Sequence, residues 1–305
     1  MDVNSANNSS YEMNEQNLDS ETYIAKARQE INDWMYPDSS ILDKTLDALV
    51  MPIEKAGEAL MNASQLGDTL KQATEKTILS LSDAANWTLD VQDTIEAYRN
   101  DSDSDGADVK KLADIQSLPI SVIDNNVKLF KSKYIALTSA QGVTTGMVGW
   151  AGIPADVVGL ITTNLRAISE YATYYGFDMS AKQEQVFAMS LLGLATSTSG
   201  DERRAALDDT FNIVNNDTSK NDSLKSDGKD PVTLALNQIN EEVMSRVLRQ
   251  TATKVATNLV KTKAAQIIPA VGAVVAGGVN ASYTASVCEA AYQCYRQRFL
   301  DRQKA

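Results

Sequence analysis

The chain has 305 residues, a formal net charge of −12, 43% hydrophobic residues and 6% aromatic residues. This composition is sufficient for a buried core and favours an all-α fold. Histidine is absent, which excludes Ser-His and Cys-His nucleophile pairs and the commonest transition-metal ligand.

The N-terminal residues 1–20 are rich in Asn, Ser and acidic side chains, so we expect a disordered polar tail there. They lack the basic and apolar regions of a signal peptide, which favours a cytoplasmic location. From Tyr23 to about Trp34, apolar residues recur at helical spacing and predict a first helix. Residues 40–61 and 64–99 predict further amphipathic helices.

An acidic loop follows at residues 100–108. Asp101, Asp103 and Asp105 alternate before a glycine, as in the first half of an EF-hand calcium loop. Leu112 occupies the position where that loop requires a bidentate glutamate. The segment is therefore a weak calcium candidate, and a solvated acidic turn is the favoured interpretation. No other metal site is predicted.

The central stretch, residues 142–176, is dense in glycine and continues into an amphipathic helix. If the stretch is helical throughout, its glycines form one stripe with little side chain, which lets another backbone or a lipid chain approach closely. These glycines are Gly142, Gly146, Gly149, Gly152 and Gly159. No preceding strand or Gly-Lys-Ser/Thr signature accompanies them, so helix packing is favoured over a phosphate cradle.

The helix that follows Pro154 has two faces. The predicted core face consists of Val157, Ile161, Leu165, Ile168, Ala172 and Tyr175. Asp156, Arg166 and Glu170 lie on the adjacent polar side. One interpretation is structural: Asp156 favours the helix N-terminus and Arg166 pairs with Glu170 one turn on. The other is that Asp156 and Arg166 mark a polar site that holds a lipid head group.

The C-terminal part continues the helical pattern. Asp178 or Ser180 is expected to cap the next helix. Residues 215–230 form a polar loop of low complexity. The last helix carries Cys288 and Cys294, which lie six residues apart and therefore point to different sides. We expect two buried, unbridged thiols.

Charge is unevenly distributed, because residues 1–126 hold 24 acidic and 9 basic side chains. Later, basic residues precede two uncharged runs, 134–155 and 264–288, each long enough to cross a bilayer but poor in Leu and Phe. Two interpretations remain: core helices of a bundle, or a lipid-facing element with a basic surface. The basic residues are Lys128, Lys131, Lys133, Arg246, Arg249, Lys254, Lys261 and Lys263.

Three blocks of the sequence resemble the bacterial EcsC family. The central signature is matched at Gly142, Gly146, Gly149, Pro154, Asp156, Arg166, Tyr175 and Gly176. The closing motif is matched at Pro269, Gly272, Gly278, Asn280, Ala290, Tyr295 and Arg298. The opening segment is similar at Trp34, Pro37, Pro52 and Ile53. The family is named for association with an ABC-transporter operon and has no agreed biochemical activity. The resemblance implies a bacterial, mostly helical protein at the inner membrane face.

Together these features predict one helical domain over residues 21–305, a multi-helix bundle with two central glycine-rich apolar helices. We expect a non-enzymatic, membrane-peripheral or lipid-interacting protein, associated with transport, whose partner is a lipid or a membrane protein. The alternative is a soluble protein-binding or scaffold module with an acidic partner surface. An enzyme with a Ser-Lys pair is left open, but no catalytic residue is singled out. No cofactor is predicted. Nucleic acid is disfavoured because no aromatics interleave with the basic residues.

Overall fold

The computed structural model describes residues 20–37, 68, 72, 75–76, 79–80, 89–100, 108–147, 153–197, 200–215, 249–257 and 272–303. Residues 1–19, 101–107 and 216–230, which carry the predicted tail and most of the two predicted loops, lie outside them. No strand occurs in the part of the chain that the structure describes, and the predicted all-α fold is confirmed.

Helices make up most of the described residues. In chain order they are helix 20–35, α5 (Val91–Asn100), the 3-10 helix η3 (Leu112–Ser117), α6 (Ile120–Val127), α7 (Phe130–Gly146), α8 (Ile153–Tyr174), α9 (Lys182–Ala195), α10 (Gly200–Asn215), a helical segment at 249–257 and α13 (Gly272–Arg302). Pro119 is the N-cap residue of α6 and has a ψ of 138°, so this proline separates η3 from α6.

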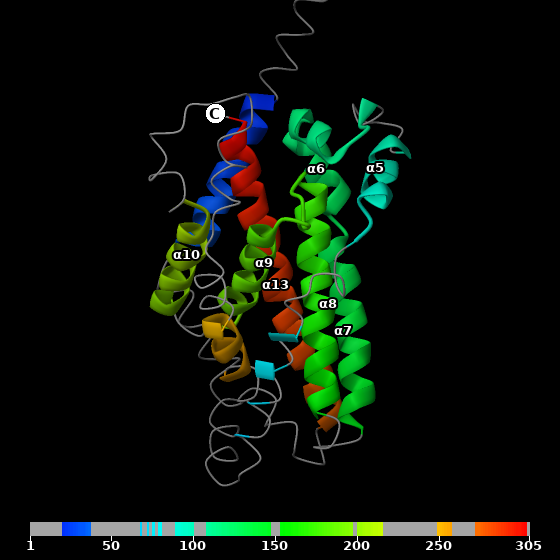
Figure 1. The fold of residues 1–305 in the computed structure, drawn as a ribbon, viewed down its shortest axis with the longest axis vertical. Helices are drawn as coiled ribbons and strands as arrows, with labels where there is room; N and C mark the ends of the chain where they lie inside the picture. The colour runs from blue at the N-terminus through cyan, green and yellow to red at the C-terminus, as the bar shows by residue number, and fades with distance from the viewer. Residues whose placement is uncertain are drawn as a thin grey trace, which may run out of the picture.

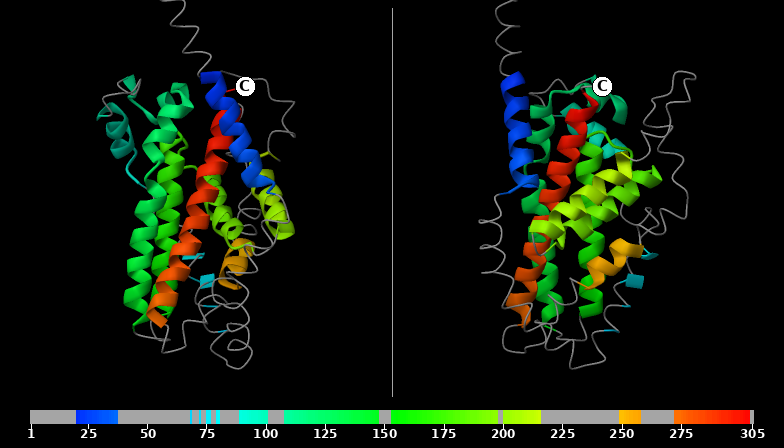
Figure 2. Two further views of the ribbon diagram at one scale, coloured as in Figure 1. Left: turned by 180° about the vertical axis from the view of Figure 1, so that it is seen from behind. Right: turned by 90° about the vertical axis from the view of Figure 1, so that its left-hand side faces the viewer.

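Three long helices form the centre of the molecule. α7, α8 and α13 run side by side, and α13 makes its most extensive contact with α7 (Figure 1). α9 packs against α13 and α8, while helix 20–35 and α10 lie on the side of α13 away from α7 (Figure 2). α13, with 31 residues, is the longest described helix and connects the two sides of the bundle.

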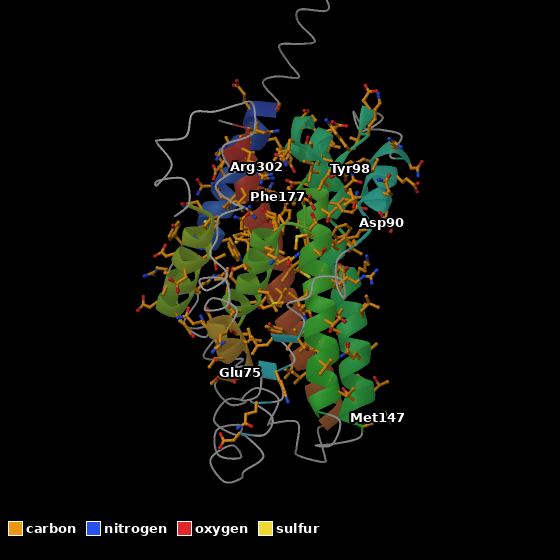
Figure 3. All side chains as sticks on the ribbon, viewed as in Figure 1. Glu75, Asp90, Tyr98, Met147, Phe177 and Arg302 are labelled. Atoms are coloured by element: carbon orange, nitrogen blue, oxygen red, sulfur yellow. The ribbon has the colours of Figure 1, made fainter. Side chains whose placement is uncertain are left out.

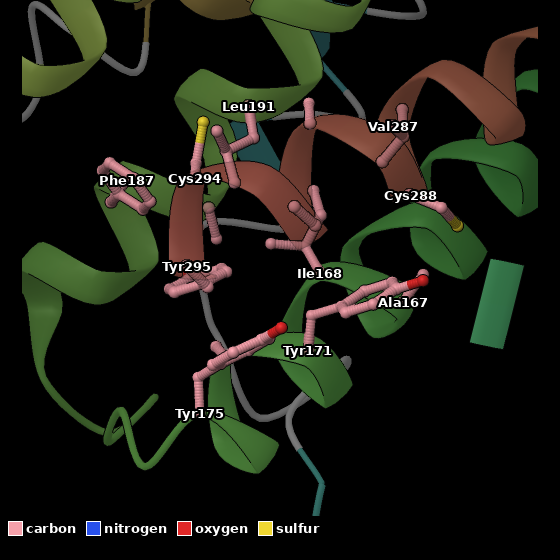
Figure 4. Close-up of a cluster of buried hydrophobic side chains, with 14 of the residues drawn as sticks. Ala167, Ile168, Tyr171, Tyr175, Phe187, Leu191, Val287, Cys288, Cys294 and Tyr295 are labelled. Carbon is pink, nitrogen blue, oxygen red and sulfur yellow. The ribbon is translucent and has the colours of Figure 1, made fainter. Parts of the chain in front are cut away.

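The core face predicted for α8 is confirmed. Its six residues are all buried, each with at most 1% of its surface exposed. Around the upper part of α8, aromatic rings fill the space between helices: Tyr171 and Tyr175 face α13, and Phe187 of α9 packs edge-on against Tyr295 at 5.3 Å (Figure 4). Burying large rings contributes most of the stabilisation of such a core.

Two local predictions have different outcomes. Cys288 and Cys294 are free, buried and directed to different sides of α13, as expected (Figure 4). The cap predicted for α9 is wrong. The helix begins at Lys182 with Ala181 as its N-cap residue and no side-chain cap. The Asp178 carboxylate instead accepts a hydrogen bond from the Ser180 backbone N–H at 2.9 Å, which stabilises the turn before the helix.

Candidate functional site

The glycine-dense stretch is not one helix, so the predicted continuous stripe is wrong. Gly142 and Gly146 belong to the end of α7, whereas Gly159 belongs to α8, which runs back beside α7 (Figure 1). Pro154 lies in the first turn of α8, where the missing N–H of proline is not needed. The glycines therefore face different neighbours.

The second glycine-rich helix contacts α7 through Gly277, whereas the predicted site residue Gly278 takes no part in this contact. A Cβ on Gly277 would lie 3.0 Å from Val143 Cγ2 and 3.3 Å from the Ser139 carbonyl oxygen. A Cβ on Gly278 would meet nothing within 4 Å. Gly142, on the same part of α7, is buried. The small residues thus allow α7 and α13 to approach closely.

A buried polar cluster joins the three central helices beside this contact. Asp156, 1% exposed in the first turn of α8, accepts a hydrogen bond from Asn280 Nδ2 at 3.0 Å. The same amide lies 3.1 Å from the Thr138 carbonyl oxygen of α7. Gln141 Nε2 also donates to the Asp156 carbonyl oxygen at 3.1 Å. Two predicted site residues, Asp156 and Asn280, therefore form one interhelical cluster.

Arg166 does not belong to that cluster. It lies ten residues along α8 from Asp156, which is about 15 Å of helix rise, and its side chain is exposed. The predicted pair with Glu170 is wrong, because both Glu170 carboxylate oxygens bind Lys133 Nζ of α7 at 2.8 Å. A lysine from the neighbouring helix replaces the expected intrahelical partner.

Of the five described residues of the predicted basic surface, three are paired with acidic groups. Lys131 binds Glu289 at 2.7 Å, and Lys254 lies 3.7 Å from Glu202. Lys128 donates to the side-chain oxygen of Asn125 at 2.7 Å. Together with the Lys133 pair, these contacts leave little free positive charge on α7. Arg249 is exposed.

Below these ion pairs, the exposed surface of the three central helices carries no charge in the described residues. Residues 134–147, 153–165 and 272–288 contain one charged side chain, Asp156, and it is buried. Large apolar side chains are exposed here instead. These are Leu137 (52%), Val143 (42%), Met147 (77%) and Val158 (41%). We call this region the uncharged end. Met147 marks it at the foot of α7, far from Phe177 and Arg302 (Figure 3).

Tyr175 belongs to a second buried cluster at the opposite end of α8. Its hydroxyl donates to Asp124 Oδ1 at 2.6 Å, and Arg296 lies 2.6 Å from Asp124 Oδ2. Tyr23 donates to the same carboxylate, and Arg296 also binds Glu30 at 2.7 Å. Burial raises the pKa of the Asp124 carboxyl, although Arg296 and the tyrosine hydroxyls oppose this shift. The cluster joins α6, α8, α13 and helix 20–35.

Gly176 terminates α8. It has a φ of +76°, and its backbone N–H donates to the Thr173 carbonyl at 2.9 Å while Phe177 N–H donates to Ala172 at 2.9 Å. This is a Schellman cap, for which glycine is the preferred residue. Gln116 Nε2 donates to the Tyr175 carbonyl oxygen at 2.8 Å. A Cβ added to Gly176 would lie 2.7 Å from the same nitrogen, which is too close for both to fit without a shift of the Gln116 side chain. The family-motif glycine therefore has a structural role here.

The remaining predicted site residues can be placed only by their position along the chain. Gly146, Pro154 and Gly272 lie in described helices, and only their backbone positions are described. Gly149, Pro269, Arg246, Lys261, Lys263 and the calcium candidates Asp101, Asp103 and Asp105 lie outside the described residues. Within the described ranges, no group of three or more metal-ligating acidic or cysteine side chains is found.

The sequence alone did not indicate the buried pair of Glu184 and Arg298. The guanidinium donates to both carboxylate oxygens, at 2.7 and 2.5 Å, and both residues are less than 10% exposed. Phe177 and Phe187 lie 4.3 and 4.2 Å from the guanidinium carbon, measured to the ring centroids. Arg298 lies near the C-terminal end of α13, where a basic side chain also suits the helix dipole. One sequence signal could have indicated this ion pair: Glu184 lies on the core face of α9, and a buried carboxylate needs a charged partner.

The protein is a helical bundle with a close helix–helix contact at a glycine, buried polar clusters and one uncharged exposed end. Comparison with known proteins identifies the family to which it belongs. A family model described as the EcsC protein family matches residues 25–300, so the chain belongs to that family and the resemblance is confirmed. The chain is also similar to the "Uncharacterized protein YdbA" of Bacillus subtilis (strain 168), 25% identical over 196 residues, which are 64% of this chain and 65% of that protein. The chain thus spans about 65% of the length of that relative. No solved structure matches the chain.

Proposed function

We propose that this protein is a peripheral membrane protein that inserts its uncharged end into one leaflet of a bilayer. The supporting observation is the concentration of exposed apolar side chains. Of the large hydrophobic residues that are exposed in the described part of the chain, Leu137, Val143, Met147 and Val158 lie on this end. Large exposed apolar patches mark protein or membrane contact sites.

The dimensions of the uncharged end suit one leaflet. From Lys133 to Met147, α7 rises about 20 Å. A leaflet contributes about half of the ~30 Å hydrocarbon core, so the end can reach through one leaflet. None of the helices in the described ranges is long and apolar enough to cross a membrane. Insertion from one side is therefore the membrane contact that this part of the fold supports.

The charged groups above the uncharged end would lie at the level of the lipid head groups. Arg166 is exposed there, while Lys131 and Lys133 are paired with Glu289 and Glu170. Because two of the three cations already have acidic partners, anionic lipid adds a secondary contribution through Arg166. We therefore expect binding to depend mainly on apolar insertion and to weaken only modestly with salt.

Vesicle flotation tests the proposal with matched variants on one helix. Met147→Glu and Leu137→Glu introduce a carboxylate into the inserted surface, and each should reduce the bound fraction at least tenfold, since a charge in the bilayer costs about 2.5–3.5 kcal/mol at its centre. Leu129→Glu is the control, because Leu129 is 66% exposed on the same segment but lies beyond Lys133. The control should bind like the unmodified protein.

Phosphatidylcholine vesicles with and without phosphatidylglycerol separate the two contributions. Arg166→Ala should lower binding only to the vesicles that contain phosphatidylglycerol. Failure of the unmodified protein to float with either composition would sink the proposal. So would a Leu129→Glu variant that loses as much binding as Met147→Glu.

A soluble protein-binding module is the second candidate, and the Gly277 contact favours it. Because α13 packs on Ser139 and Val143 of α7, the glycine-rich helices close on each other as core helices do. The uncharged end would then bind a protein partner. In that case Met147→Glu should disrupt a purified hetero-complex, while the unmodified protein stays unbound in the flotation experiment.

A further inference from the structure

A groove of about 310 Å³ lies along α13, bordered by the end of helix 20–35, α7, the end of α9 and α10. In Figure 2 helix 20–35 and α10 lie together beside α13 on this side of the bundle. Trp34 and Leu194 supply apolar walls, and Ser282, Ser286 and Glu289 face the groove from α13. The groove lies apart from Met147 and the foot of α7.

Arg203 is the unusual feature of the groove. Its guanidinium stacks on the Trp34 ring, 4.4 Å from the centroid. Its Nε is buried and has no hydrogen-bond partner, and no carboxylate in the described residues pairs with it. Burial lowers the pKa of Arg203, which reflects the loss of water around the charge. Stacking uses the face of the guanidinium and leaves its N–H edge available to an acceptor.

The nearest acidic group in the groove is already occupied. Glu289 binds Lys131 at 2.7 Å through one oxygen and accepts from Gln293 at 2.9 Å through the other. Although burial opposes the shift, these hydrogen bonds lower the pKa of Glu289 and hold it as a carboxylate. Glu289 also interacts electrostatically with Arg203, and the three charged residues that line the groove, Lys131, Arg203 and Glu289, leave a net charge of about +1.

We propose that this groove binds a phosphate group, held by the N–H edge of Arg203 and by the hydroxyls of Ser282 and Ser286. The two serines are one helical turn apart on α13 and line the same space as the guanidinium. The Ser286 hydroxyl donates to the Ser282 carbonyl oxygen at 3.2 Å and would turn from that oxygen to the phosphate on binding. A phosphate has enough oxygen atoms to accept hydrogen bonds from all of these donors at once. A carboxylate has only two oxygens and would satisfy fewer of them. The groove is larger than a bare ion, so the ligand is an organic phosphate whose apolar part lies against Trp34 and Leu194.

The phosphate can belong to a soluble metabolite or to a lipid head group, and soluble probes distinguish them without any vesicle. The full chain is used with Trp87→Phe and Trp150→Phe, which leaves Trp34 as the only fluorophore of its kind. Inorganic phosphate, glycerol 3-phosphate and dihexanoyl phosphatidic acid are titrated separately. Because Arg203 stacks on Trp34, occupancy should change the Trp34 emission and saturate with a Kd below about 1 mM for at least one probe.

Arg203→Gln should weaken binding at least tenfold, and Arg203→Lys, which keeps the charge but not the fork, should weaken it less. Arg204→Gln is the matched control, since Arg204 is exposed and pairs with Asp201 at 3.2 Å. Thermal melting confirms folding, and Ser286→Ala replaces Arg203→Gln if that variant unfolds. Saturation by phosphate or glycerol 3-phosphate supports a soluble ligand, and saturation by the lipid alone supports a head group. No response to any probe, or equal losses in Arg203→Gln and Arg204→Gln, overturns the proposal whatever the result of vesicle flotation.

Discussion

Gly277 and Gly278 are adjacent in α13 yet have opposite surroundings, which makes them a matched pair for testing the α7–α13 contact. We consider Ala and Val at both positions. At Gly278 an added Cβ meets nothing within 4 Å. Alanine there should stabilise the protein by about 0.5–1 kcal/mol, because alanine loses less backbone entropy than glycine in a helix.

At Gly277 the same propensity gain is opposed by crowding. The new Cβ would lie 3.0 Å from Val143 Cγ2 and 3.3 Å from the Ser139 carbonyl oxygen, which belongs to the backbone of α7. Alanine should therefore be roughly neutral, within about 1 kcal/mol. Valine adds two methyl groups to a Cβ that already contacts α7. Overpacking of this kind lowers the free energy of unfolding by about 1–3 kcal/mol.

Urea denaturation followed by far-UV circular dichroism measures these free energies. The decisive quantity is the difference between the two valine variants, because intrinsic helix propensity is the same at both positions and cancels. We expect Gly277→Val to be less stable than Gly278→Val by at least about 1 kcal/mol. Equal stabilities would show that α7 and α13 do not approach closely at Gly277, and the packing argument would then be wrong.

Two further predictions concern buried ionisable groups. Glu184→Leu leaves the Arg298 charge buried without its bidentate partner and should lower the free energy of unfolding by about 3–5 kcal/mol. The double variant Glu184→Leu/Arg298→Met should recover part of that loss in the same urea assay. If the losses of the two single variants simply add in the double variant, the two residues are not coupled and the prediction is wrong. Burial raises the pKa of Cys288 and Cys294 from 9.0 to about 12. The unfolded chain thus releases these protons first, and stability should fall as the pH rises from about 9 towards 12, by up to about 1.4 kcal/mol per pH unit for each thiol. A Cys288→Ala/Cys294→Ala variant should lose this part of the alkaline slope, and an unchanged slope would refute it.

Much of the local structure could be predicted from the sequence because it depends on short-range periodicity. The core face of α8 repeats at helical spacing, and all six of its predicted residues are buried. The burial of Cys288 and Cys294 is also a property of neighbouring residues. A repeat of 3.6 residues shows which face of a helix is apolar, but it contains no information about which helix covers that face.

The tertiary structure decided every pairing between distant residues. It divided the glycine-dense stretch between two antiparallel helices, and selected Gly277 rather than Gly278 for contact. It also gave Glu170 a partner on α7 in place of Arg166. The sequence by itself determined the helical class, the apolar faces and the family. Partners such as Asn280 for Asp156, 124 residues apart, depend on how whole helices pack, because each distant contact is set by the summed fit of many side chains rather than by local spacing.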